Sequence, residues 1–449
     1  MLLIRLPHTS VKTIVPILHM ALIALLYILG FNLIYFFFFF VVLTYIILFP
    51  KKLLNPKNIV FAYYFVWHCL APAFANRYKY INLEFGEHRV NTAFLMCFVT
   101  YAVSMFALEL FLGDLDTGKR IVVPIKRISP KAKREEKKKR KNSQLVFGLL
   151  PLAIVSILFV VGLYVYIRRT GGIAAWISSA NDAFFNRGGA GLFYILFTHT
   201  LLLLLYFEGQ RAETGLWSYF RRILYIALLA VSYTFIGSRS TTFMMILVLF
   251  ADRVIKLDTL DRKSLLIIFS GLTVFVVGMI VRLGDLMRIS LSVSVNQILN
   301  YFDTFENLLI LLRDFSPDIG KTFFLPLNWP LVKMGVTAFS PFYDMSVWLT
   351  TEYYPESWLN GGTTQWPIEA DMYMSFMFWG GIPVLILYFG IIAYIYKKAQ
   401  DKGIWQFIYI IEGFYILSHL RGGFLIYWYY WLIPLYIWLV MRYGRKNKL

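Results

Sequence analysis

Apolar runs of about 17–25 residues recur from one end of the chain to the other, and they constrain its fold more than any other feature. In lipid, a spanning segment has to satisfy its backbone amides and carbonyls within a helix or a closed barrel, and runs of this length indicate helices. Only 15% of the 449 residues are charged, against roughly a quarter in soluble proteins. The sequence therefore predicts an all-α, polytopic membrane bundle of about twelve transmembrane helices.

The predicted spans divide the chain into five parts. We place the spans near residues 13–30, 31–49, 57–75, 90–112, 145–167, 191–207, 219–236, 239–255, 264–283, 371–396, 404–420 and 423–442. The parts are N-terminal helices (1–112), a basic loop (113–144), a second group of helices (145–283), a large and partly helical outer loop (284–370), and C-terminal helices with a basic tail (371–449).

The lysines and arginines are divided unequally between the two faces of this bundle. Of the 44, 31 fall on one face, as 19 Lys and 12 Arg, which leaves 3 Lys and 10 Arg on the other face. The positive-inside bias makes the lysine-rich face cytoplasmic and places both termini there. The net charge of +19 is then a topology signal beside membrane lipid, and we expect no nucleic-acid partner.

The outer arginines point to an anionic substrate, because guanidinium binds phosphate with a planar fork that lysine lacks. Arg239, Arg282 and Arg421 lie on three separate outer connections, and Arg288 follows Arg282. Arg239 stands between Ser238 and Ser240 at a predicted helix start, where free amides and the dipole favour an anion. Snorkelling arginines and an ordinary helix cap are the alternative interpretation.

Three residues are candidates for a general base. Glu369 and Asp371 lie at the predicted mouth of the bundle, and His419 lies two residues before Arg421. A partly buried carboxylate there is suited to proton transfer. The alternative for both acids is stabilisation of a helix N-terminus by the dipole.

The outer loop is far longer than a connection requires, which favours a function of its own. Its first part, 295–315, has apolar residues at helical spacing and predicts an amphipathic helix over the bundle. We consider its polar residues and later aromatic residues as contacts for a sugar acceptor, with an interfacial aromatic belt as the alternative. These acceptor-loop candidates are Asp303, Glu306, Arg313, Trp329 and Tyr343.

The two cysteines do not indicate a metal centre or a disulfide. Cys69 and Cys97 both fall inside predicted spans, without zinc-binding spacing. We expect no cofactor and no bound metal.

Several short stretches together resemble one bacterial protein family. Gly237-Ser238-Arg239-Ser240 resembles its Gly-(Ser/Thr)-Arg turn, and Tyr301–Leu308 with Pro326–Trp329 resembles the entry to its large loop. The acidic stretch Ile368–Phe376, followed by Gly380-Gly381, resembles the start of its next span. Over residues 145–442, the chain thus resembles the oligosaccharide repeat-unit polymerases, the Wzy-type group of O-antigen and enterobacterial common antigen polymerases.

The resemblance implies a GT-C-like glycosyltransferase in the bacterial cytoplasmic (inner) membrane, with its active site facing outward. It would join undecaprenyl-diphosphate-linked oligosaccharide repeat units into a surface polysaccharide, beside a flippase and a chain-length regulator. Arginines would hold the leaving diphosphate, and Glu369, Asp371 or His419 would deprotonate the acceptor. The residues assigned to the diphosphate are Arg239, Arg282, Arg421, Arg288, Ser238 and Ser240.

Four alternatives stay open at this point: an O-antigen ligase, another lipid-dependent glycosyltransferase, a flippase or other transporter, and a non-catalytic membrane scaffold. The related O-antigen ligases resemble the chain in substrate class, but residues 284–370 contain no histidine of the kind found in the ligases' outer loop. Twelve spans with both termini inside are also typical of a flippase or another transporter, which should show internal repeats and interrupted helices.

Overall fold

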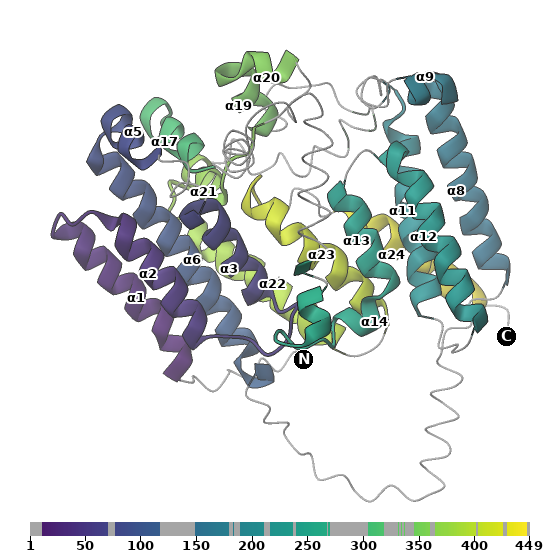
Figure 1. Cartoon of the computed structure of the whole chain (residues 1–449), viewed down its shortest axis with the longest axis horizontal. Helices are drawn as coiled ribbons and strands as arrows, with labels where there is room; N and C mark the ends of the chain where they lie inside the picture. The colour runs from purple at the N-terminus through teal and green to yellow at the C-terminus, as the bar shows by residue number, and fades with distance from the viewer. Residues whose placement is uncertain are drawn as a thin grey trace, which may run out of the picture.

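The structure is a computed structural model that describes most of the helical part of the chain (Figure 1). The described residues are 11–70, 77–116, 149–178, 183, 189–210, 216–236, 239–266, 268–269, 304–317, 331, 334, 336, 345–359, 364–400, 403–424 and 429–446. Within these ranges the secondary structure is helical apart from an isolated β-bridge between Lys52 and Asp258.

The helices form three groups along the chain. The N-terminal group is α1 (Val11–Ile28), α2 (Leu33–Ile47), α3 (Pro56–Tyr63), the π-helix η1 (Tyr64–Leu70), α5 (Arg77–Phe85) and α6 (Glu87–Asp116). The middle group is α8 (Leu149–Arg169), α9 (Gly172–Ser178), α11 (Gly191–Gly209), α12 (Leu216–Ile236), α13 (Arg239–Leu249) and α14 (Ala251–Val254). The C-terminal group is α17 (Phe305–Asp314), α19 (Met345–Tyr353), α20 (Pro355–Leu359), α21 (Ile368–Phe376), α22 (Gly381–Ala399), α23 (Ile404–Leu420) and α24 (Tyr429–Lys446).

Helix α23 lies between the N-terminal group and the middle group of helices. It packs against α3 and α22 in one half, and against α13 and α24 in the other (Figure 1). Helix α22 also packs along α6, so this C-terminal helix belongs to the same bundle as the N-terminal helices. The C-terminal end of α23 therefore lies where N-terminal and C-terminal parts of the sequence come together.

The predicted helical membrane class is confirmed in its coarse form. Helices α1, α6, α8, α11 and α22 are long and apolar enough to cross a membrane, and α2, α23 and part of α24 are shorter apolar helices. The count of twelve stays a prediction, because the predicted span 264–283 lies largely outside the described residues.

The prediction of one continuous span over 371–396 is wrong. Helix α21 ends at Phe376, and Met377 and Phe378 take left-handed φ values of 50° and 64° before α22 begins at Gly381. A Cβ on Gly381 would lie 2.9 Å from Cγ of Met372, so only glycine lets α22 start this close to α21. The acidic start of the predicted span is thus a short separate helix.

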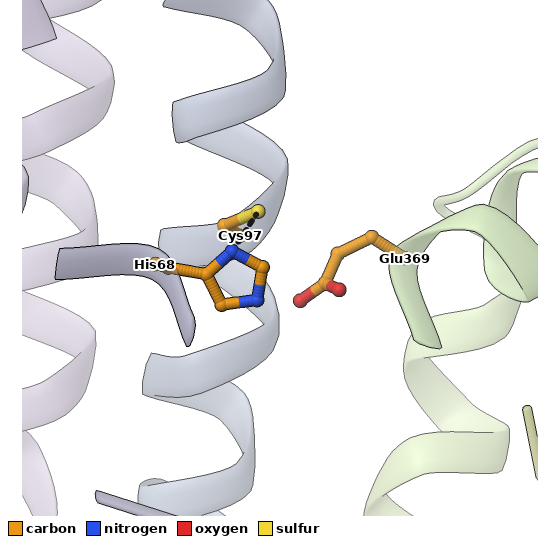
Figure 2. Close-up of side chains that lie close together, drawn as sticks. All are labelled: His68, Cys97 and Glu369. Carbon is orange, nitrogen blue, oxygen red and sulfur yellow. Dashed lines mark hydrogen bonds between the residues drawn. The ribbon is translucent and has the colours of Figure 1, made fainter. Parts of the chain in front are cut away.

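The predicted span over 57–75 also changes its winding. It begins as α3 and becomes the π-helix η1 at Tyr64. A π-helix is a rare, locally widened segment that occurs frequently at functional sites. In this one, His68 is turned toward Cys97 of α6 (Figure 2).

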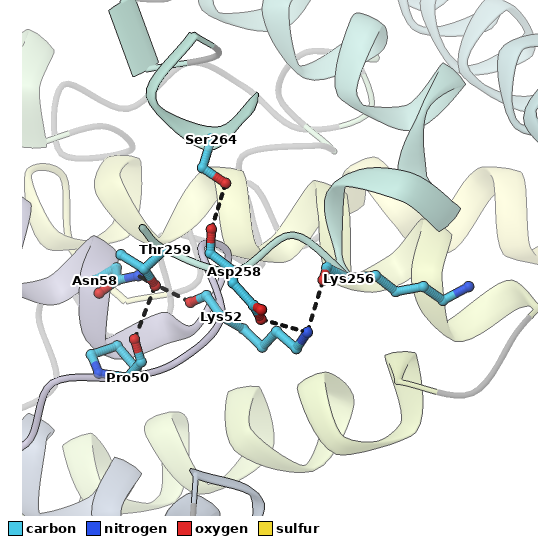
Figure 3. Close-up of polar contacts among 7 residues, drawn as sticks. All are labelled: Pro50, Lys52, Asn58, Lys256, Asp258, Thr259 and Ser264. Atoms are coloured by element: carbon cyan, nitrogen blue, oxygen red, sulfur yellow. Dashed lines mark hydrogen bonds and ion pairs between the residues drawn. The ribbon is translucent and has the colours of Figure 1, made fainter. Parts of the chain in front are cut away.

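A clasp of polar contacts joins the segment before α3 to the segment after α14 (Figure 3). Nζ of Lys52 lies 2.8 Å from Oδ1 of Asp258, and the Thr259 hydroxyl donates to the Pro50 carbonyl at 2.9 Å. The clasp brings together two basic connections that the charge pattern assigns to the same face. It fixes the N-terminal helices relative to the middle group.

A buried ion pair connects α3 to α6. Nζ of Lys57 donates to Oε2 of Glu109, and the two side chains are only 1% and 3% exposed. Removal of one member would leave the other charge buried without its main counter-ion, which costs far more than loss of a surface pair.

We predict that Glu109→Gln lowers the free energy of unfolding by about 3–5 kcal/mol. The double variant Lys57→Met with Glu109→Leu should recover most of this loss, because no buried charge is left. The measurement is thermal unfolding in detergent, with Asp252→Asn in the exposed pair with Lys256 as a control. Equal effects of Glu109→Gln and Asp252→Asn would contradict the account.

Candidate active site

Three elements that are far apart in the sequence meet at the end of α23. They are η1, the first turn of α21, and the turn at residues 421–424. The Tyr63 hydroxyl, just before η1, donates to the Leu420 carbonyl at 2.8 Å and so holds α3 against the end of α23. This junction contains Glu369, Asp371, His419 and Arg421, four of the residues singled out from the sequence.

Glu369 is the most deeply buried acid of the junction. Its side chain is 0% exposed, and the Tyr64 hydroxyl donates to its Oε1 at 2.5 Å. Its Oε2 has no hydrogen-bond partner among the described residues. The Thr100 hydroxyl lies close to this carboxyl but donates to the Met96 carbonyl at 2.9 Å. One oxygen of Glu369 is therefore held in place while the other is available to accept a proton.

Asp371 has a different role, although it lies only two residues away. Its Oδ1 accepts from the Ser375 hydroxyl and its Oδ2 accepts from the Phe424 amide, both at 3.2 Å. Gly423 has a left-handed φ of +97°, and a Cβ there would lie 3.1 Å from Oδ2 of Asp371. Asp371 thus anchors the turn that carries Arg421, so the structure separates two acids that the sequence left equivalent.

Arg421 caps the C-terminus of α23 and is partly exposed. Its Cζ lies 5.8 Å from the centre of the Trp67 ring, a cation–π distance. Trp67 in turn stacks on Tyr63 at 5.3 Å, whose hydroxyl donates to the Leu420 carbonyl beside Arg421. The described residues show no carboxylate paired with Arg421, so its charge is available to an anionic ligand.

His419 is the second-to-last residue of α23 and is fully buried. Its Nδ1 lies 2.6 Å from the Tyr388 hydroxyl of α22, and its Nε2 has no hydrogen-bond partner among the described residues. The Tyr388 contact fixes the ring orientation. His419 therefore stays a second candidate for proton transfer, behind Glu369.

Most of the predicted anion-binding and acceptor side chains lie outside the described part of the structure. Arg239 and Ser240 begin α13, but their side chains lie outside the described part of the structure. The residues that lie wholly outside it are Ser238, Arg282, Arg288, Asp303, Trp329 and Tyr343. The three-arginine clamp stays a prediction, with only Arg421 located.

Helix α17 packs over the junction, against α6 and α21. It confirms the second part of the amphipathic helix predicted over 295–315, because its apolar face packs on α6 and α21, and residues 295–303 lie outside the described part of the chain. Phe305 stacks on Phe94 at 4.4 Å, and its ring centre lies 6.3 Å from that of His68. Glu306 is only partly buried on this helix.

Arg313 has a structural role at the end of α17. Its Nε and Nη2 donate to the two oxygens of Asp314 at 2.7 and 3.0 Å, and its Cζ lies 5.0 Å from the centre of the Phe85 ring of α5. Asp314 also accepts from the Tyr353 hydroxyl at 2.7 Å. The pair thus links α17 to α5 and α19.

Sequence reasoning missed the N-terminal half of the site. Tyr64, His68 and Cys97 come from segments that we interpreted only as membrane spans. Sγ of Cys97 lies 3.9 Å from Nδ1 of His68, and ligand atoms of Cys97, His68 and Glu369 all lie within 4.8 Å of one another (Figure 2). Only the presence of polar residues in apolar stretches could have signalled them, and that signal does not show where they point.

In comparisons with known proteins, no protein-family model, no curated protein and no solved structure matches the chain. Functional interpretation therefore rests on the geometry of the junction and on the residues themselves.

We predict that the packing of α17 weakens in acid. The Arg313 hydrogen bonds hold the pKa of Asp314 below its ordinary value of 3.8. A lowered folded-state pKa gives a stabilising contribution that is present above the ordinary pKa and is lost as the pH falls through the folded-state value. Hydrogen exchange of residues 305–317 should rise in that window, and Asp314→Asn should remove the pH dependence. Glu352→Gln, an exposed acid on α19, is the control; an unchanged profile in Asp314→Asn would contradict the link.

Proposed function

We propose that the protein is an integral membrane glycosyltransferase with a GT-C-like organisation. It would polymerise undecaprenyl-diphosphate-linked oligosaccharide repeat units at the outer face of a bacterial cytoplasmic membrane. One observation carries the proposal: a buried carboxylate with an available oxygen, Glu369, shares a junction with an arginine whose charge no described acid neutralises, Arg421.

These two groups suit the two ends of a glycosyl transfer. Oε2 of Glu369 would accept the proton of the acceptor sugar's hydroxyl. The hydroxyl oxygen of the acceptor would then attack the anomeric carbon of the donor. The bond between this carbon and the diphosphate oxygen breaks, and the charge moves onto the diphosphate. Arg421 would stabilise that charge with its planar fork, as fixed cations do for developing oxyanions.

The surrounding aromatic residues support this assignment. Trp67 stacks on Tyr63 and lies against the guanidinium of Arg421, and the Tyr64 hydroxyl orients the carboxylate of Glu369. Aromatic faces also stack on the C–H faces of sugars. The predicted membrane topology places Arg239 on the same outer face as Arg421, and Arg239 is the second cation expected at the diphosphate.

One observation favours a second candidate, a flippase for the same lipid-linked sugars. Transporters carry interrupted helices at their substrate sites, and here α21 and α22 are separated by a left-handed break. Under this alternative, Arg421 would bind the diphosphate during translocation, and Glu369 would have no chemical role.

We predict that Glu369→Gln and Arg421→Ala each lower the rate of polymer formation at least about 100-fold. The assay uses purified protein and lipid-linked repeat units in detergent, where transport cannot contribute. Asp371→Asn should keep most of the activity, because an amide oxygen can still accept from the Phe424 amide. Arg169→Ala is the matched arginine control, since Arg169 also ends a helix and lies over an aromatic ring, that of Phe193.

Two outcomes would contradict the proposal. Full activity of Glu369→Gln, or equal losses in Glu369→Gln and Asp371→Asn, would remove the base assignment. Absence of polymer from the unaltered protein, together with lipid translocation in vesicles, would favour the flippase.

A further inference from the structure

We propose that His68, Cys97 and Glu369 form a binding site for a divalent transition metal, with Zn²⁺ as the ion that fits their chemistry. They supply one imidazole, one thiolate and one carboxylate from three separate elements, η1, α6 and α21. All three side chains are buried, and their ligand atoms lie within 4.8 Å of one another (Figure 2). Zn²⁺ binds these three ligand types, and three protein ligands leave a fourth position open.

The spacing of the ligand atoms is close to that of a tetrahedral zinc site. With Zn–S of about 2.3 Å and Zn–N of about 2.0 Å, sulfur and nitrogen lie about 3.6 Å apart. Sγ of Cys97 and Nδ1 of His68 lie 3.9 Å apart. Side-chain rotations that move the ligand atoms by a few tenths of an ångström to about 1 Å would bring all three within bonding distance of one ion.

Charge balance favours a dication in this buried position. Zn²⁺ with one thiolate, one carboxylate and one neutral imidazole has no net charge, which is the arrangement that costs least in a medium of low dielectric constant. Cys97 would give up its thiol proton as the ion binds. Oε2 of Glu369 has no hydrogen-bond partner among the described residues, so it offers a lone pair to the ion.

The Tyr64 hydroxyl provides the outer support that such sites use. It donates to Oε1 of Glu369 at 2.5 Å and so fixes the carboxylate while Oε2 stays available. Hydrogen bonds to ligating carboxylates orient them and raise metal affinity. Phe305 stacks on Phe94, and its ring centre lies 6.3 Å from that of His68, so apolar side chains adjoin the site.

The metal site would exist with or without the proposed glycosyl transfer, but a bound ion would affect that reaction. An ion on Oε2 of Glu369 takes the lone pair that would accept the acceptor's proton. Zn²⁺ should therefore suppress polymer formation reversibly, and a chelator should restore it. Metal binding without inhibition would contradict the base role of Glu369 and leave the metal site intact.

The test is equilibrium titration of the chelator-treated full-length protein in detergent with Co²⁺, which reports a thiolate ligand by charge-transfer absorption in the near ultraviolet. We expect one Co²⁺ per chain, displaced by Zn²⁺. Cys97→Ser should abolish the absorption and weaken binding at least about 100-fold. Cys69→Ser is the matched control, because it removes the other buried cysteine and should leave both unchanged.

Thermal unfolding gives a second readout that needs no activity. Zn²⁺ should raise the midpoint of the unaltered protein and of Cys69→Ser, and it should not raise that of Cys97→Ser. Where Cys97→Ser does not yield folded protein by size exclusion, Glu369→Gln takes its place and should keep the absorption with weaker affinity. Absence of stoichiometric binding, or equal losses in Cys97→Ser and Cys69→Ser, would overturn the proposal.

Discussion

The cost of burying a carboxylate inside a helical bundle governs the arrangement of this site. Glu369 is fully buried, and a lone charge in such surroundings is expensive unless it is paired, hydrogen-bonded or bound to an ion. Among the described residues, the Tyr64 hydroxyl donates to Oε1, and Oε2 has no hydrogen-bond partner. The charge on Oε2 is therefore not compensated by a described group. Either a metal ion or the proton of a substrate hydroxyl would compensate it. Both proposals follow from this single condition.

The rest of the fold positions that carboxyl. The left-handed break after Phe376 separates α21 from α22, which lets α21 lie as a short helix under α17. Asp371 then reaches the turn after α23 and fixes the arginine that follows His419 and Leu420. On the other side, the widened turns of η1 carry Tyr64 and His68 against α6. The buried Lys57–Glu109 pair holds the lower part of the same helices together.

The sequence predicted the helical membrane class because long apolar runs admit few other structures. It also singled out Glu369 and Arg421, which the structure brings to one junction, since charged residues at the ends of apolar runs are conspicuous. It did not separate Glu369 from Asp371, because that difference depends on which acid reaches the Phe424 amide. Tyr64 and His68 were missed and Cys97 was set aside, since polar side chains inside a span show their direction only once the helices are packed. The break at Met377 was missed because neither Met377 nor Phe378 favours a left-handed conformation.

The central claim is that Glu369 and Arg421 belong to one site for a diphosphate-linked sugar. A cryo-electron microscopy structure of the full-length protein in lipid nanodiscs with an undecaprenyl-diphosphate-linked oligosaccharide tests it most directly. The account predicts diphosphate density on the guanidinium of Arg421, with the first sugar directed toward Oε2 of Glu369. Diphosphate bound elsewhere, with Arg421 facing only lipid headgroups and Glu369 enclosed by protein alone, would contradict it.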